Sequence, residues 1–458
     1  MKSPVLSILF LLISVTLLAV PNDFRFRHFS VEDGLSSNSV RAIMQDKYGF
    51  LWIGTEEGLN RYDGIMIKSY SICPQAAGKY ISSLYGTKKN IWIGTDEGIY
   101  IYAYATETFT YFDLTTPNNV RITSIVNHIL QDKDGNLWFS TNGQGLFRYN
   151  LSKNYLEQYE FTSAFGIVAS TMADSDNQIW ALTNQGESGV YKLNKAENKF
   201  EPFGLLYNAG NHHSQALAML EDSEQTLWLG TWECGLQKID KYTRQTTTYL
   251  HPTDGKGVTH IHSLMEYAPH QLLIGSDDGL LLFNTLTEEY KLFTENETVP
   301  NSLSNRFVYP IIKDREGGIW IGTYYGGINY ISPNAEQFES FSHSRLYNSI
   351  NGNVIGRFCE DAHGQIWIAS DDGGLNRYSP KDRKFVYYLP ADHKNSLSYH
   401  NVHALCMDGD NLWIGTYTGG VNVLNLQTGT FNLIQISRPH WTEPVLTPSL
   451  KTDRIESG

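Results

Sequence analysis

LWIGT at residues 51–55 decides the fold of this chain, because eight variants of the same phrase follow it. The nine copies begin at residues 51, 91, 137, 179, 227, 272, 319, 366 and 412, with spacings of 40 to 48 residues. A short strand-like phrase that recurs with a period in the forties is typical of β-propeller blades. The sequence therefore predicts an all-β fold built from repeated blades.

Each repeat contains enough strand-like segments for a complete blade. In residues 39–70, apolar and polar residues alternate over 40–45, and LWIGT and two further segments follow, separated by Gly-containing turns. We expect these segments to form four short antiparallel strands, which is the blade of a β-propeller.

Three residue types in the repeat have predicted structural roles. Trp52 and Gly54 share one face of the second strand, where we expect the Trp to fill the space between blades and the Gly to make room for a neighbour's side chain. The preceding turn, 46–49, starts with Asp and ends with Gly, which suits a tight turn. The same turn recurs at 132–135, 314–317 and 361–364. It offers too few oxygen ligands for calcium, so we interpret it as structural.

The two ends of the first seven repeats predict how the ring closes. FRFRHFS at 24–30 reads as a fourth strand without its first three, and it matches QFESFS at 337–342. We therefore expect a seven-bladed propeller over 24–336, closed by the 24–30 strand, which removes exposed sheet edges. Residues 337–436 would form two further blades of an incomplete second propeller, and 437–458, with three prolines, an irregular tail.

The composition and the N-terminus limit the possible partners and the location. A net charge of −13 and the lack of a basic run disfavour a nucleic-acid partner, because phosphate binding needs clustered Lys and Arg. Residues 1–20 carry Lys2 and then a long apolar run, which predicts a signal peptide, with an uncleaved N-terminal anchor as the alternative. We thus place the chain outside the cytoplasm. The four cysteines, at 73, 234, 359 and 406, form no CxxC motif. Cys359 and Cys406 occupy matching positions one repeat apart, and we interpret them as buried core residues.

The repeats resemble the periplasmic sensor region of hybrid two-component systems of gut Bacteroidetes, whose repeats are called two-component regulator propeller repeats. The resemblance covers nearly all of 24–436 and includes FSVEDGLSSNSVRAIMQDKYGFLWIGTEEGLNRYDG at 29–64, NSLSNRFV at 301–308 and NSLSYHNV at 395–402. It implies two seven-bladed propellers, a β-sandwich, a membrane helix, a histidine kinase, a receiver and a DNA-binding domain. Compared with that domain order, we expect this chain to be a truncated sensor. We expect it in the periplasm, either free or anchored to the inner membrane by its N-terminal segment.

The turns between second and third strands vary from blade to blade, and they are expected to surround the central funnel. Aromatic rings and planar polar side chains are the groups that bind sugars. The candidate ligand-binding residues are Trp232, Glu233, Tyr324, Tyr325, Asn142, Gln144 and Asn184. Trp232 is the strongest candidate, because a Trp in a turn has no evident role in blade packing.

Other polar patterns receive a structural interpretation. Paired acids at 56–57, 96–97, 277–278 and 371–372 recur at one blade position, which indicates turn chemistry rather than glycoside hydrolysis. His260 and His262 share one face of a strand, but no third metal ligand is identifiable. We predict no catalytic residue, metal or cofactor.

These observations favour a ligand-sensing module that binds oligosaccharides from polysaccharide breakdown and controls glycan-utilisation genes. Two alternatives remain open. One is a propeller glycoside hydrolase or polysaccharide lyase, and the other is a scaffold whose incomplete second ring docks a protein, a homodimer included.

Overall fold

The computed structural model describes residues 24–72, 79–161, 166–183, 189–204, 215–251, 257–296, 299, 301–333, 341, 343, 348–392 and 395–434. The predicted signal peptide or anchor at 1–20, the tail at 437–458, Cys73 and most of the 337–342 segment lie outside these residues. The chain divides into two compact units between residues 336 and 337. Among the described residues, no helix has the length and apolarity needed to cross a membrane.

The described residues form nine four-stranded antiparallel sheets, which confirms the predicted all-β propeller fold. Seven of them belong to the first unit, which we call the ring. The first strands of these sheets are β2 (Val40–Gln45), β6 (Ile81–Gly86), β10 (Val126–Gln131), β14 (Val168–Ala173), β18 (Ala216–Glu221), β22 (Ile261–Ala268) and β26 (Val308–Lys313). The second strands carry the repeated phrase and are β3 (Leu51–Thr55), β7 (Asn90–Thr95), β11 (Leu137–Thr141), β15 (Ile179–Thr183), β19 (Leu227–Thr231), β23 (Gln271–Ser276) and β27 (Ile319–Thr323).

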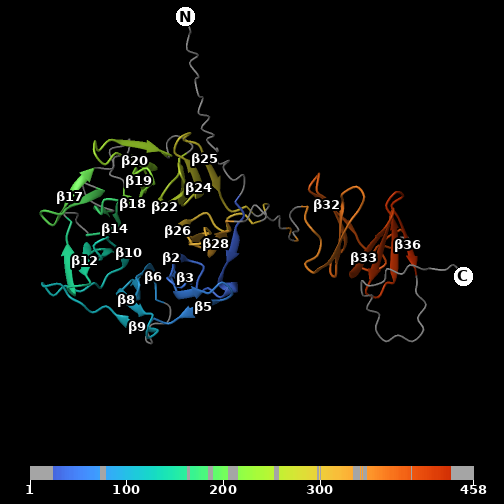
Figure 1. The fold of residues 1–458 in the computed structure, drawn as a ribbon, viewed down its shortest axis with the longest axis horizontal. Helices are drawn as coiled ribbons and strands as arrows, with labels where there is room; N and C mark the ends of the chain where they lie inside the picture. The colour runs from blue at the N-terminus through green and yellow to red at the C-terminus, as the bar shows by residue number, and fades with distance from the viewer. Residues whose placement is uncertain are drawn as a thin grey trace, which may run out of the picture. The chain divides into compact units, whose positions relative to one another are not determined.

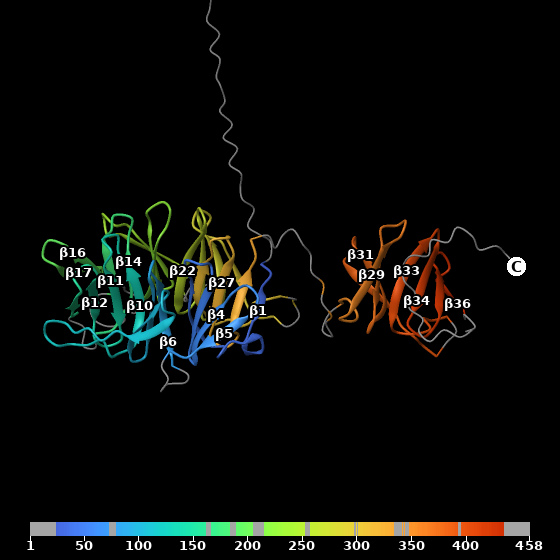
Figure 2. The same cartoon turned by 60° about the horizontal axis from the view of Figure 1, so that its bottom comes forward.

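The outer half of each sheet completes the blade. The third strands are β4 (Gly58–Tyr62), β8 (Gly98–Ala103), β12 (Leu146–Asn150), β16 (Val190–Asn194), β20 (Leu236–Ile239), β24 (Gly279–Asn284) and β28 (Ile328–Ile331). The fourth strands are β5 (Ile67–Tyr70), β9 (Thr108–Tyr111), β13 (Tyr155–Tyr159), β17 (Lys199–Gly204), β21 (Thr246–Tyr249), β25 (Tyr290–Phe293) and β1 (Arg27–Phe29). Figure 1 shows the first strands toward the centre of the ring and the outer strands at its perimeter. In Figure 2, β10, β11 and β12 lie side by side within one sheet.

The ring closes through its N-terminal strand. β1 pairs antiparallel with β28, so that the seventh sheet has the order β1-β28-β27-β26, as the 24–30 segment predicts. Neighbouring first strands contact one another all the way round, from β2 through β26 and back to β2. A short 3-10 helix, η1 (Val31–Asp33), connects β1 to the first sheet.

The repeated Trp and Asp are hydrogen-bonded to each other within six of the nine described sheets. The indole N–H of Trp52 donates to a carboxylate oxygen of Asp46 over 2.9 Å, and the turn's backbone N–H groups bind the other oxygen. The same Trp–Asp bond joins residues 138 and 132, 180 and 174, 228 and 222, 320 and 314, and 367 and 361. The Asp is therefore structural, as predicted.

The Gly of the phrase admits a β-branched side chain from the next blade, which confirms its predicted role. A Cβ atom at Gly54 would lie 2.5 Å from a methyl group of Ile81, and one at Gly230 would lie 2.4 Å from a methyl group of Ile261. In the fourth blade the sizes are reversed: Leu182 replaces the Gly, and Ala216 replaces the β-branched residue in the same packed cluster. In both arrangements a large side chain on one blade packs against a small residue on its neighbour, so that the contact is filled.

The second unit contains two sheets. They consist of β29 (Ile355–Glu360), β30 (Ile366–Ser370), β31 (Gly374–Ser379) and β32 (Lys384–Tyr388), then β33 (Val402–Asp408), β34 (Asn411–Thr416), β35 (Val421–Asn425) and β36 (Thr430–Ile434). On β29, the Phe358 side chain is 66% exposed.

The prediction that Cys359 and Cys406 are buried core residues is wrong. Cys234 is buried, but Cys359 is half-buried and Cys406 is exposed. Both lie on first strands of the second unit, and two sheets do not enclose a first strand as the seven sheets of the ring do.

Candidate functional site

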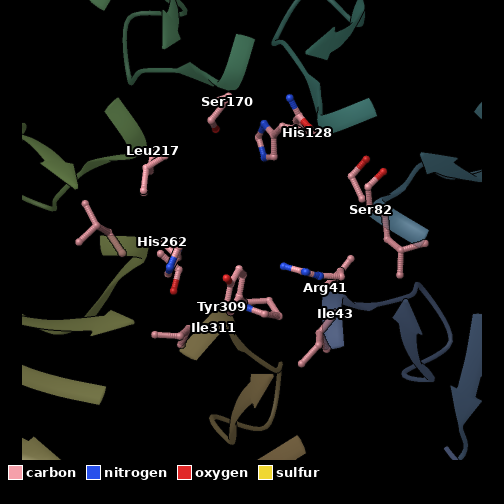
Figure 3. Close-up of a pocket in the computed structure, with 18 of the residues that line it drawn as sticks. Arg41, Ile43, Ser82, His128, Ser170, Leu217, His262, Tyr309 and Ile311 are labelled. Atoms are coloured by element: carbon pink, nitrogen blue, oxygen red, sulfur yellow. The ribbon is translucent and has the colours of Figure 1, made fainter. Parts of the chain in front are cut away.

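The first strands of the ring line a central cavity of about 600 Å³ (Figure 3). Each first strand begins with a residue that packs into the neighbouring blade, and the next residue then faces the cavity. These cavity-facing residues are Arg41, Ser82, Asn127, Ala169, Leu217, His262 and Tyr309. The three bulky polar ones, His262, Tyr309 and Arg41, come from consecutive blades, the sixth, seventh and first.

Arg41 is held by a carboxylate and by aromatic rings. Its Nε and one terminal nitrogen donate to Oε1 of Glu56 over 3.1 and 2.6 Å. Its guanidinium carbon lies 4.7 Å from the ring centre of Tyr309 and 4.4 Å from that of Tyr324. Burial lowers the pKa of Arg41, but Tyr80 and the hydrogen bond to Glu56 outweigh it, so that the net pKa is raised. The guanidinium therefore stays charged and fixed in orientation, pointing into the cavity in Figure 3.

Asp277 holds two histidines at the same rim. Its two oxygens bind Nδ1 of His260 over 2.5 Å and Nε2 of His262 over 2.8 Å. Burial raises the pKa of Asp277, whereas the hydrogen bonds from His262 and His260 lower it more, so that the carboxylate stays ionised. His260 adopts a left-handed backbone conformation with φ of 50°, which is uncommon for a residue other than Gly and is offset here by the bond to Asp277.

Stacked rings connect these groups into one surface. His260 stacks on Trp232 with ring centres 3.7 Å apart, and His262 stacks on Tyr309 at 4.2 Å. Tyr309 lies 5.7 Å from Tyr324, which contacts the exposed Tyr325 edge to face at 4.4 Å. We call these six residues, Trp232, His260, His262, Tyr309, Tyr324 and Tyr325, the aromatic arc.

The predicted site residues have different outcomes. Trp232, Tyr324 and Tyr325 belong to the aromatic arc, and Glu233 is exposed in the turn beside it. Asn142 is exposed and lines the cavity on the third blade, away from the arc. Asn184 lies outside the described residues. That these residues bind a ligand stays a prediction.

Gln144 is hydrogen-bonded to a neighbouring loop, and its predicted role in ligand binding stays a prediction. Its side-chain oxygen accepts from the backbone N–H groups of Thr123 and Ser124 over 2.9 and 3.0 Å, and its amide nitrogen donates to the Arg121 carbonyl over 2.9 Å. These bonds hold the loop that leads into the third blade, so that little of the carboxamide remains for a sugar hydroxyl.

Two of the paired acids, Glu56 and Asp277, do more than shape their turns, because they bind Arg41 and the two histidines. Three others bind neighbouring loops or side chains. Asp278 accepts from the backbone and side chain of Thr259, Glu97 pairs with Lys79, and Asp372 accepts from the backbone N–H groups of Asn353 and Val354. No cluster of three metal-ligating side chains occurs among the described residues. His260 and His262 bind Asp277 rather than converging with it on a common point.

Sequence reasoning missed Arg41, Tyr309 and the role of the two histidines. A usable signal is the residue that follows the first, blade-packing residue of each first strand, because three consecutive blades carry a bulky polar residue there, His262, Tyr309 and Arg41. The variable turns alone identify only half of the arc.

Comparison with known proteins agrees with this architecture. The family model described as "Two component regulator propeller" matches residues 34–57, 121–143, 302–325, 349–372 and 396–418. The chain is 46% identical over 68 residues to histidine kinase P4 of Formosa agariphila. The matched segment is 15% of this chain and 5% of that protein.

Solved structures show the same fold. The extracellular domain of a hybrid two-component system from B. thetaiotaomicron is 26% identical, with a TM-score of 0.59 over 91% of this chain and 55% of that domain. A streptogramin B lyase, 16% identical over 68% of this chain and 97% of its own, has a TM-score of 0.53 and shares the fold alone. The chain thus spans little more than half of the similar sensor domain. It is a β-propeller protein in which five segments match the two-component regulator propeller family, and it is similar to the extracellular domain of a hybrid two-component system.

Proposed function

We propose that this chain is the extracytoplasmic ligand-binding module of a hybrid two-component regulator and that it binds an oligosaccharide at the mouth of the ring. The signal would control genes for glycan utilisation through the rest of the regulator. The similarity to an extracellular sensor domain supports the extracytoplasmic location, in the periplasm.

The aromatic arc carries this proposal. Sugars present C–H faces that pack on aromatic rings and hydroxyls that bind planar polar groups. The arc offers an exposed Tyr325 and a half-buried Trp232 and Tyr324, next to the Arg41–Glu56 pair. The cavity, at about 600 Å³, has the size of a small-molecule site.

Thermal unfolding and titration calorimetry of the full chain test the proposal against a broad panel of oligosaccharides. A true ligand binds only the folded state, so that at a concentration of 100 times Kd it raises the free energy of unfolding by about 2.7 kcal/mol and with it the unfolding temperature. We expect Trp232→Ala to weaken binding by about tenfold, the loss of one well-packed ring. Tyr242→Ala is the control, since Tyr242 is 84% exposed and lies in the connection between β20 and β21, the two outer strands of its blade. A panel that produces neither heat nor a temperature shift contradicts the proposal.

A lyase is the second candidate, and one observation favours it. His262 is hydrogen-bonded to Asp277 and stacked on Tyr309, which is the kind of arrangement that orients a general base beside a proton donor. A lyase releases unsaturated oligosaccharides from a polysaccharide, whereas a sensor binds oligosaccharides and leaves them intact. Chromatography of a polysaccharide incubated with the protein separates the two.

A further inference from the structure

The charge pattern of the cavity points to the chemical class of the ligand. The described residues that line it include one permanently charged side chain, Arg41, and no carboxylate. That single positive charge is neutralised by Glu56, whose Oε1 accepts both hydrogen bonds from the guanidinium. The cavity therefore has a fixed dipole at its rim and no surplus positive charge.

The surroundings add negative charge rather than positive. Asp277 is an ionised carboxylate behind the aromatic arc, and the whole chain has a net charge of −13. Lys79, which precedes the cavity-lining Tyr80, pairs with Glu97. In sequence, the segments between 24 and 336 that lie outside the described residues contain one lysine, Lys256, and no arginine. These segments therefore contain little positive charge that could offset the negative charge around the cavity.

A carboxylate or sulfate group on a ligand would meet an unfavourable environment here. It would lose hydration on entering the cavity, and the one guanidinium that could replace the water is already bound by Glu56. It would also be repelled by Glu56 and Asp277, an effect that is stronger near a protein surface than in bulk water. An uncharged sugar meets neither cost, and its hydroxyls can accept from Arg41 and donate to Glu56.

We propose that the ligand is an uncharged oligosaccharide and that Glu56 determines this specificity by neutralising Arg41. This inference rests on the proposed function and refines it. With Glu56 replaced by a neutral amide, Arg41 would gain a free charge at the cavity mouth, and the site would accept acidic sugars.

The test uses calorimetry of the full chain with a neutral hexose oligosaccharide that binds and with the same oligosaccharide after oxidation of its primary hydroxyls to carboxylates. Native uronate and sulfated oligosaccharides form the remaining arms. We expect the neutral form to bind at least about tenfold more tightly than its oxidised form, with a smaller difference at high salt because screening weakens the repulsion.

Glu56→Gln should shift the ratio of the two affinities toward the acidic sugar by about tenfold or more. The matched control is Glu97→Gln, which removes a carboxylate from the equivalent turn of the second blade, where it pairs with Lys79. Acidic sugars that bind the unaltered protein as tightly as neutral ones, or a ratio unchanged by Glu56→Gln, overturn this inference while the proposed function stands. Absence of binding in every arm overturns the proposed function itself.

Discussion

At the scale of single residues, the cavity wall combines a charged group, Arg41, with a histidine that is kept neutral. His128 lines the cavity on the third blade, and burial lowers its pKa from 6.5 to about 4, because desolvation disfavours the imidazolium. Its Nδ1 lies 3.5 Å from the backbone nitrogen of Thr171. Near neutral pH this residue adds no charge to the cavity, which leaves the Arg41–Glu56 pair as the main electrostatic feature of the wall.

The lowered pKa of His128 predicts that the stability of the folded chain depends on pH. Between pH 6.5 and 4 the unfolded chain binds a proton at this residue and the folded chain does not, so that acidification favours unfolding. At about 1.4 kcal/mol per pKa unit, the loss approaches roughly 3 kcal/mol at the acid end. We expect His128→Gln to flatten this part of the stability curve, measured by denaturant unfolding at several pH values. His400→Gln, at an exposed position, should leave the slope unchanged; equal slopes for the wild type and His128→Gln would contradict the prediction.

At the scale of elements, the blade is the unit that repeats, and the contact between second and first strands joins the blades. Five blades of the ring pair a Gly in the second strand with a β-branched residue at the start of the next first strand, as Gly54 and Ile81 do. In the fourth blade the large residue, Leu182, is in the second strand, and the small one, Ala216, is at the start of the next first strand. The contact therefore depends on the sum of two side chains, and neither residue is determined alone.

A double-mutant cycle tests this complementarity. Leu182→Gly should cost about 2–5 kcal/mol through a cavity, and Ala216→Ile about 1–3 kcal/mol through overpacking. The double variant recreates the pair found in other blades, so we expect it to be clearly more stable than the sum of the single changes predicts. Denaturant unfolding followed by Trp fluorescence measures the coupling. Additive costs would show that the two residues do not share one packing volume.

At the scale of the whole molecule, the ring depends on a strand from the far end of its sequence. β1 completes the sheet of β26 to β28, and Phe26, 2% exposed, is buried in a cluster with residues of the sixth and seventh blades. This closure leaves no open sheet edge between the first and last blades. It also holds the sixth, seventh and first blades together, and these blades supply His262, Tyr309 and Arg41.

Phe26→Ala should therefore weaken the ring as a whole. We expect a loss of about 3–5 kcal/mol, the usual cost of removing a buried Phe side chain. Because the blades of the ring contact each other in a closed circle, the change should shift the unfolding of distant blades as well, which Trp fluorescence reports. The exposed Tyr242→Ala serves as the reference, with an expected change within about 0.5 kcal/mol. A local effect, without a shift of the main transition, would argue against closure as a source of stability.

The sequence by itself determined the blade, its repetition and the closing strand, because these depend on local patterns: strand alternation, turn chemistry and the size of the residue in the phrase. It also indicated half of the candidate site, since Trp232, Tyr324 and Tyr325 stand out in variable turns. Only the tertiary structure decided the other half. Arg41 lies more than 260 positions before Tyr309 in the sequence, yet ring closure places the guanidinium over that ring. Gln144 shows the converse. Its place in a variable turn suggests a binding residue, whereas in the structure its side chain is hydrogen-bonded to the loop at 121–123. Which side chains meet in the cavity follows from the closed circle of blades, and no local pattern contains that information.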